Sequence, residues 1–218
     1  MKIANLTALA ACIALTSCLS TSRQPGDQDS MMASLSPAQR VLIDEARTEH
    51  DRRTDELALA RREVTRAQAE RAQAKTELAV AEQRVELAEA KVTVAESGTT
   101  EELEAAREGV RVAKAKVVPQ HDLIRWRDCN LTRAEKAETL AQRAQDLAAA
   151  RVDLEKERAF AKSDRADARN TDVSKYETLV NERRTRESVA RVELEGAVRQ
   201  CSLAEQNYDA AVVTSKKN

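Results

Sequence analysis

Four cysteines are the side chains of this sequence with the most distinctive chemistry. Cys12 and Cys18 lie near the amino terminus, whereas Cys129 and Cys201 lie in the charged body of the chain. A thiol can be acylated, oxidised to a disulfide or deprotonated to bind a metal, and its surroundings decide which. Each cysteine therefore has to be interpreted from its own neighbours and spacing.

The other residue types predict no catalytic or metal centre. His50 and His121 are far apart, and neither has a Cys or His at ligand spacing. The glycines are isolated, so they form no glycine-rich phosphate loop. Carboxylates are abundant, but a thin helical body has no deep pocket in which their pKa values would separate for acid/base catalysis. We expect a protein that is not an enzyme and that uses no cofactor or metal.

Cys18 ends a segment that is typical of an export signal. Met1-Lys2 is positively charged, and residues 3–16 are apolar but shorter than the about 20 residues that span a bilayer. The segment ends in Leu15-Thr16-Ser17-Cys18, which resembles the lipobox of bacterial lipoproteins. The resemblance implies that residues 1–17 are a signal peptide and that Cys18 is the lipidation site.

Lipidation implies that the mature protein is anchored to a membrane through acyl chains such as palmitate on Cys18. Three chains on the new amino terminus exceed the two signals that stable anchoring needs. Leu19, rather than Asp, follows the cysteine, which implies the periplasmic side of the outer membrane. The other interpretation is an ordinary secretory signal in which Cys18 is incidental. Residues 18–35 contain Pro25-Gly26 and many polar residues, so we expect a flexible tether.

The body of the chain has the composition of long helices. Aromatic residues make up 2% and charged residues 33%, so the chain is suited to helices that bury a narrow seam. A net charge of −1 leaves no basic surplus for nucleic acid. We predict an all-α fold of long antiparallel coiled-coil hairpins over residues 36–212. The three expected helices cover residues 37–96, 100–162 and 170–212, and a short tail covers 213–218.

Capping motifs set the ends of the first hairpin. Ser36 and Gln39 have the spacing of a capping box, in which each side chain bonds the other residue's backbone N–H, and Thr99 and Glu102 repeat it. Gly98 suits the left-handed conformation that often ends a helix. A tight turn at Gly98 and an antiparallel return are therefore predicted.

Heptad spacing continues on both sides of that turn. The first helix has alanine at six successive positions seven residues apart, which lets a neighbouring helix approach closely. These residues are Ala60, Ala67, Ala74, Ala81, Ala88 and Ala95. Folding back at the turn places Leu57 opposite Leu140 and Ala88 opposite Gly109. Pro119 removes one backbone hydrogen bond and predicts a kink or short break in the second helix.

Cys129 and Cys201 are expected to form a disulfide within one chain. Compartments outside the cytoplasm are oxidising, and the midpoint of the two cysteines falls in the polar segment 162–171, where helices two and three must turn. The same pairing places Trp126 opposite Ala204. A bridge that closes so long a loop stabilises by about 4 kcal/mol in the chain-entropy model. An intermolecular bridge and two free thiols are the alternatives.

Two resemblances bear on the role of the helical body. Alanine-rich heptads behind a lipidated cysteine resemble the murein lipoprotein of the outer membrane, whose C-terminal Lys is linked to peptidoglycan. Here Lys216-Lys217 is followed by Asn218, so the resemblance does not extend to that link. The hairpin also resembles that of efflux-pump periplasmic adaptors, which flank it with β domains that this sequence does not predict.

These observations favour a lipid-anchored, periplasm-facing outer-membrane lipoprotein that acts as a structural spacer, scaffold or accessory subunit of an envelope assembly. Its partner would be another protein or a further copy, because Val80, Leu87 and Val94 lie off the main seam and form an apolar strip. The alternative is a binding module that captures a cell-wall or protein ligand near Pro119 and Trp126. An exposed Trp beside a cleft would favour that alternative.

Overall fold

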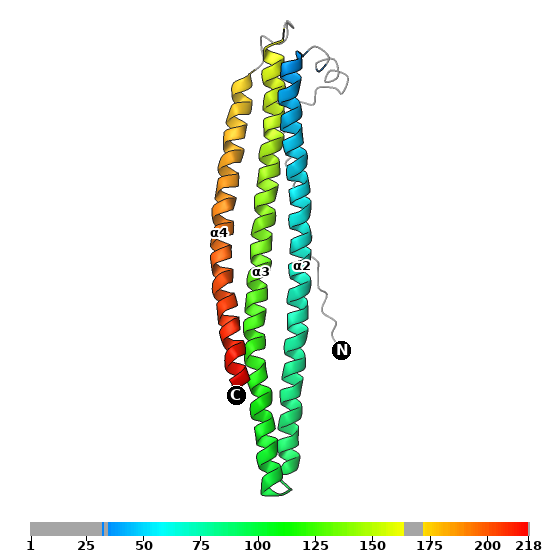
Figure 1. The fold of residues 1–218 in the computed structure, drawn as a ribbon, viewed down its shortest axis with the longest axis vertical. Coiled ribbons are helices and arrows are strands. Elements are labelled where there is room, and N and C mark those ends of the chain that lie inside the picture. Colours follow the sequence, from blue (N-terminus) through cyan, green and yellow to red (C-terminus); the bar gives the residue numbers. More distant parts are fainter. Residues whose placement is uncertain (1–31, 33–34, 164–171, 218) are drawn as a thin grey trace, which may run out of the picture.

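The computed structural model describes Met32, residues 35–163 and residues 172–217, and these form three long helices (Figure 1). Helix α2 spans Pro37–Ala95, α3 spans Thr100–Ala161 and α4 spans Val173–Lys217. The described residues contain no strand, so the all-α prediction is confirmed. The signal segment with Cys18 and the segment 164–171 lie outside the described residues.

Both predicted capping boxes are present. The backbone N–H of Ser36 donates to Oε1 of Gln39 at 2.8 Å, and Gln39 N–H donates to Ser36 Oγ at 3.4 Å. Thr99 N–H donates to Glu102 Oε2 at 2.7 Å, and Glu102 N–H donates to Thr99 Oγ1 at 3.2 Å. These bonds satisfy backbone donors that a helix start otherwise leaves unpaired.

The prediction of a left-handed backbone at Gly98 is wrong. No described glycine has a positive φ. A Cβ atom at Gly98 would instead run into the carboxylate of Glu102, the group that closes the second capping box. A residue with a Cβ atom at this position would therefore have to displace the Glu102 carboxylate from the capping box, and no special backbone conformation is involved.

Two other differences from expectation concern Pro119 and the end of the last helix: the short break expected at Pro119 is absent, whereas a kink there stays a prediction. Helix α3 continues through Pro119 without a break, and the proline itself is buried. One missing backbone hydrogen bond is therefore not enough to interrupt a helix that packs against neighbours on two sides. Helix α4 runs on to Lys217, beyond the expected end near residue 212.

The three helices lie in an open row with α3 in the middle. Helix α2 packs along one side of α3 and α4 along the other, while α2 and α4 make almost no contact (Figure 1). The predicted register is matched by Arg127 and Glu70, which lie opposite each other and pair at 2.5 Å, and Arg61 pairs with Glu138 at 3.3 Å, two residues from that register. Lys114 also reaches across to Glu89 at 2.8 Å. The end of the α2–α3 hairpin extends past the C-terminal end of α4 (Figure 1).

Burial is concentrated where the three helices run side by side. Leu147, Ala150 and Leu154 of α3 pack with Val180 of α4 in one buried cluster. By contrast, no residue from Lys75 to Val118 is fully buried. We call that part the distal hairpin. On α4 the fully buried residues lie on the side of the helix that packs on α3, and they are Val180, Ala190, Ala197 and Cys201.

Candidate functional site

The segment Trp126-Arg127-Asp128-Cys129 of α3, which we call the junction, is connected to both neighbouring helices. Its four consecutive residues each contact a different residue on a neighbouring helix. Because successive residues of an α-helix point about 100° apart, a central helix can reach both neighbours from one turn. The four partners are Tyr208, Glu70, Arg71 and Cys201, in that order.

Cys129 and Cys201 lie at disulfide distance within one chain. Their Cα atoms are 5.3 Å apart, and 72 residues separate them in sequence. This spacing falls within the usual range for a disulfide, so the bridge needs no displacement of either helix. The link ties α4 to α3 at the level where the sequence predicted that the cysteines face each other.

Two ion pairs tie α2 to α3 at the same level. Arg127 Nη1 lies 2.5 Å from Glu70 Oε2, and Arg71 pairs with Asp128. Glu70 also accepts from Arg66 on its own helix at 3.0 Å. The side chains of Arg127 and Glu70 are only 27% and 30% exposed, so water screens this pair less than a fully solvated one.

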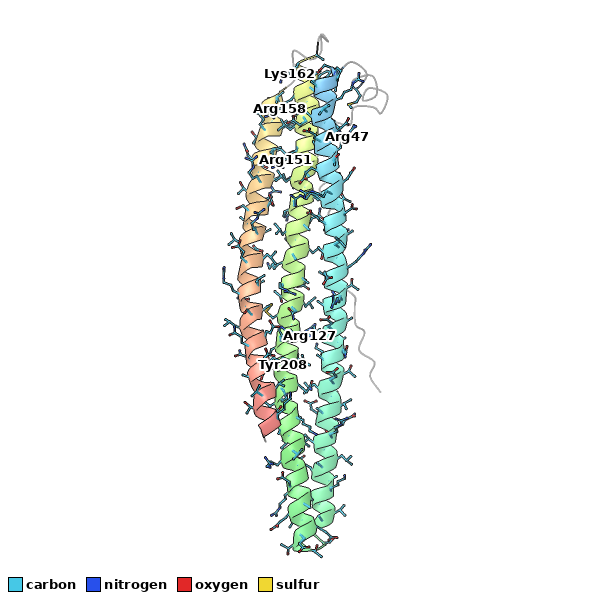
Figure 2. All side chains as sticks on the ribbon, viewed as in Figure 1. Arg47, Arg127, Arg151, Arg158, Lys162 and Tyr208 are labelled. Carbon is cyan, nitrogen blue, oxygen red and sulfur yellow. A yellow bond between two sulfur atoms is a disulfide. The ribbon has the colours of Figure 1, made fainter. Side chains whose placement is uncertain are left out.

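Trp126 is a packing residue of the junction. Its ring stacks on Tyr208 with centroids 5.5 Å apart and planes 12° apart, and the guanidinium carbon of Arg127 lies 4.5 Å from the Trp126 ring centroid. Figure 2 shows Arg127 and Tyr208 near the C-terminal end of α4. The feature that would mark Trp126 as a binding residue, an exposed ring beside a cleft, is therefore not what the described residues form.

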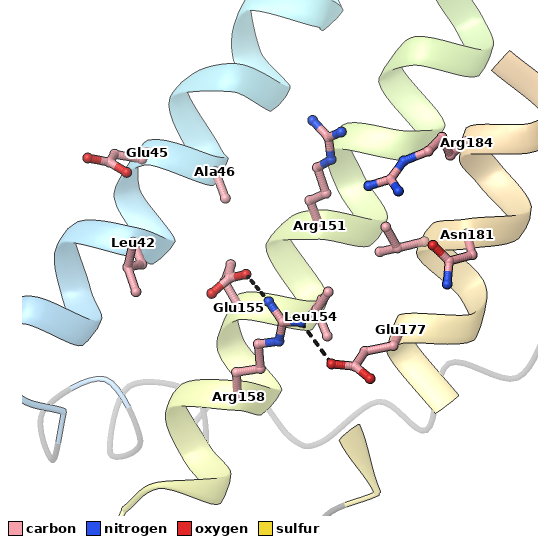
Figure 3. Close-up of a pocket in the computed structure, with 11 residues that line it drawn as sticks. Leu42, Glu45, Ala46, Arg151, Leu154, Glu155, Arg158, Glu177, Asn181 and Arg184 are labelled. Carbon is pink, nitrogen blue, oxygen red and sulfur yellow. Dashed lines mark hydrogen bonds and ion pairs between the residues drawn. The ribbon is translucent and has the colours of Figure 1, made fainter. Parts of the chain in front are cut away.

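Because α2 and α4 barely meet, the surface of α3 between them is hollowed into grooves. One of these, the Arg158 groove, has a volume of about 470 Å³ and is lined by all three helices (Figure 3). Arg158 lies within it and donates to Glu155 at 3.0 Å and to Glu177 at 2.8 Å. The hydrogen bond to Glu177 is the main reason that the pKa of Arg158 is raised.

Two further arginines line the Arg158 groove. The guanidinium groups of Arg151 on α3 and Arg184 on α4 point toward each other (Figure 3). Neither forms an ion pair with a described residue, and both side chains are exposed. Leu154 and Val180 form the apolar floor beneath them.

The second groove lies where α4 ends and is called the Pro119 groove. It has a volume of about 520 Å³, with Val80 from α2, Pro119 and Gln120 from α3, and Tyr208 and Val212 from α4 among its lining residues. The side-chain Oε1 of Gln120 is buried and has no hydrogen-bond partner. A buried amide oxygen without a donor is costly, so it is a polar group that a ligand could satisfy. No pattern in the sequence indicates this oxygen, because an amide becomes unsatisfied only through packing.

The histidines are placed apart, as their spacing predicts. His50 lies on α2, with Nδ1 3.3 Å from Asp51 Oδ1, and His121 lies exposed on α3. Within the described part of the chain, no group of three or more His, Cys, Asp or Glu side chains could hold a metal ion. Nor is any described helix long and apolar enough to cross a membrane.

Comparisons with known proteins identify no relative of this chain. No family model matches the chain, and the comparisons with curated proteins and with solved structures find no significant match.

Proposed function

We propose that this chain is a lipid-anchored lipoprotein of the outer membrane, facing the periplasm, which acts as a structural spacer, scaffold or accessory subunit of an envelope assembly. The observation that supports the proposal best is the uninterrupted α2–α3 hairpin. Helix α2 has 59 residues and α3 has 62, so each is about 90 Å long at 1.5 Å per residue. A rod of that length beginning directly after a lipidated tether would hold a partner far from the membrane.

The arrangement of the helices also favours a mechanical role. The junction ties all three helices at one level through a disulfide, two ion pairs and a ring stack. Such cross-links resist sliding of one helix along another, which is the motion that a pulling or bending force would cause. The distal hairpin, with its half-buried seam, would remain the more deformable part.

The anchor is tested by acylation of the full chain in a bacterial host. Cys18→Ala is expected to abolish incorporation of labelled palmitate and to release the protein from the outer-membrane fraction. Cys12→Ala is the matched control, because Cys12 lies in the segment that is removed and should leave both readouts unchanged. If the Cys18→Ala variant incorporated as much labelled palmitate as the unmodified chain, the lipoprotein proposal would be contradicted.

The spacer role is tested by changing the length of the rod while keeping its register. Removing residues 82–88 and 109–115 together takes one heptad from each arm and shortens the hairpin by about 10 Å. Duplicating the same two segments lengthens it by the same amount. A spacer predicts opposite shifts in the membrane-to-partner distance, measured by electron cryotomography of cells. An unchanged distance in both variants would exclude a spacer and leave the scaffold or accessory role.

The second candidate is a binding module for a cell-wall or protein ligand near Pro119, and the unsatisfied Gln120 oxygen in the Pro119 groove favours it. Val212→Arg would fill this groove and should abolish cosedimentation with purified peptidoglycan sacculi if the ligand is cell wall. Val213→Arg is the control, because Val213 is 53% exposed and does not line the groove. Equal sedimentation of both variants and the unmodified chain would count against a cell-wall ligand at this groove.

A further inference from the structure

A second apolar stripe runs along α4 on the side that faces away from α3. Val189, Val192 and Leu203 are 55%, 61% and 62% exposed, and together they form an apolar surface along one face of the helix. They continue with Gly196 and Arg199 at intervals of three and four residues, the spacing at which one helix packs on another. We call these five residues the α4 stripe.

The stripe is not the surface that α4 uses to pack on α3. The buried residues Ala190, Ala197 and Cys201 lie on the opposite side of the helix. No described helix covers the α4 stripe, since α4 packs along α3 and makes almost no contact with α2. The helix is therefore apolar on two faces, and only one of them is occupied.

Gly196 is a second, independent observation at the centre of the stripe. Glycine inside a helix is unfavourable relative to alanine, and Gly196 lies well within the 45 residues of α4. A Cβ atom at this position would meet nothing within 4 Å, so packing within one chain gives no reason for the missing side chain. A glycine on an exposed apolar stripe does allow a second helix to approach closely.

We propose that the α4 stripe binds the α4 stripe of a second copy of this chain, antiparallel, with the two-fold axis at Gly196. Val189 lies seven residues before Gly196 and Leu203 seven residues after it. The two-fold rotation therefore places Val189 of each copy against Leu203 of the other, while the two glycines meet at the axis. The surface is complementary to itself, as a two-fold symmetric interface requires.

Two charges, Arg199 in the stripe and Glu195 beside it, select the antiparallel direction. Glu195 and Arg199 are exposed, and neither forms an ion pair with a described residue. In the antiparallel arrangement Arg199 lies about 3 Å along the helix axis from Glu195 of the second copy, at 1.5 Å per residue. In a parallel arrangement Arg199 would face its own equivalent, and like charges placed together oppose association. The proposal uses no residue on which lipidation depends, so it stands apart from the proposed anchor.

Cysteine cross-linking of the full-length chain, purified in detergent, tests the register directly. Val189→Cys and Leu203→Cys proteins with different tags are mixed and mildly oxidised. The mixture is expected to give a cross-linked heterodimer, while each variant alone gives none, because each new thiol faces the other position. Gly196→Cys alone should cross-link to itself. Homodimers from Val189→Cys alone would show a parallel pairing and overturn the proposal, as would the absence of cross-links in all three experiments.

Sedimentation equilibrium tests the association itself. Val189→Glu is expected to weaken the dimer at least tenfold, whereas Val198→Glu, at a position 47% exposed but off the stripe, should leave it unchanged. Gly196→Leu separates association from folding, since a better helix former should raise the melting temperature of the monomer while weakening the dimer at least tenfold. A dimer that tolerates Gly196→Leu, or a chain that is monomeric at every concentration, would contradict the proposed interface.

Discussion

Trp126 of α3 stacks on Tyr208 of α4, one helical turn beyond the residue that the cysteine pairing places opposite it. Pairing about Cys129 and Cys201 puts Trp126 level with Ala204, yet the ring contact is made by Tyr208, with centroids 5.5 Å apart. Long side chains on a helix lean toward its N-terminus, so Tyr208 reaches back along α4 to the level of Trp126. The stack therefore extends the junction beyond the disulfide toward the C-terminal end of α4.

The ring stack should contribute to stability beyond its apolar area. Tyr208→Leu keeps an apolar side chain but removes the aromatic pairing, and should lower the free energy of unfolding by about 1 kcal/mol. A double-mutant cycle with Trp126→Leu, measured by urea unfolding, isolates the pair. If the two losses simply add, the rings do not interact and the stack carries no energy of its own.

Removing the disulfide should release α4 before the other helices. Replacing Cys129 and Cys201 by Ser removes the cross-link, so the unfolded chain gains conformational entropy. The free energy of unfolding should therefore fall by about 4 kcal/mol. Because α4 packs on α3 alone, its amide hydrogens should lose protection first in hydrogen exchange. Equal loss of protection in α2 would mean that the three helices unfold as one cooperative unit.

The distal hairpin should exchange its amide hydrogens faster than the rest of α2 and α3. No residue from Lys75 to Val118 is fully buried, whereas the part of α3 from Ala134 to Phe160 contains most of the buried residues of that helix. Local opening of the distal hairpin therefore exposes less apolar surface than local opening of the segment from Ala134 to Phe160. The free energy of opening should be smaller in the distal hairpin. Hydrogen exchange followed by mass spectrometry compares the two segments within the same molecule, and equal protection would contradict the expectation.

Glu49 should remain ionised to unusually low pH. The Arg52 guanidinium donates to the Glu49 carboxylate at 2.8 Å and, together with Arg53 and against partial desolvation, lowers the pKa of Glu49 from its ordinary value of 4.5 to about 2. Because the folded-state pKa is depressed, this contribution to stability is fully present above about pH 4.5 and is lost as the pH falls toward 2.

The pKa of the Glu49 carboxylate can be measured directly. Arg52→Gln should raise the pKa of Glu49 toward 4.5 in a carboxyl NMR titration, because the strongest hydrogen bond is lost. Arg47→Gln is the matched control on the same helix, since Arg47 pairs with Asp44 and not with Glu49. A Glu49 pKa near 4.5 in the unmodified chain would show that the carboxylate is not held by its arginines in solution.

Features that depend on local chemistry and on regular spacing could be predicted from the sequence. The capping boxes at Ser36 and Thr99 involve residues three positions apart, so their partners are fixed before any tertiary contact forms. The register of α2 against α3 follows from a tight turn between two seams. The placement of Cys129 beside Cys201 follows in the same way, because an antiparallel turn fixes which residues face each other.

Which apolar stripes are covered and which are open depends on how the three helices pack together. Heptad spacing shows that a helix has an apolar face but not what covers it, so the open row of α2, α3 and α4, the buried oxygen of Gln120 and the exposed α4 stripe were not predictable. The partner of Trp126 and the backbone at Gly98 likewise depend on where neighbouring side chains come to lie. Periodicity is a property of one helix, whereas burial is a property of several helices together.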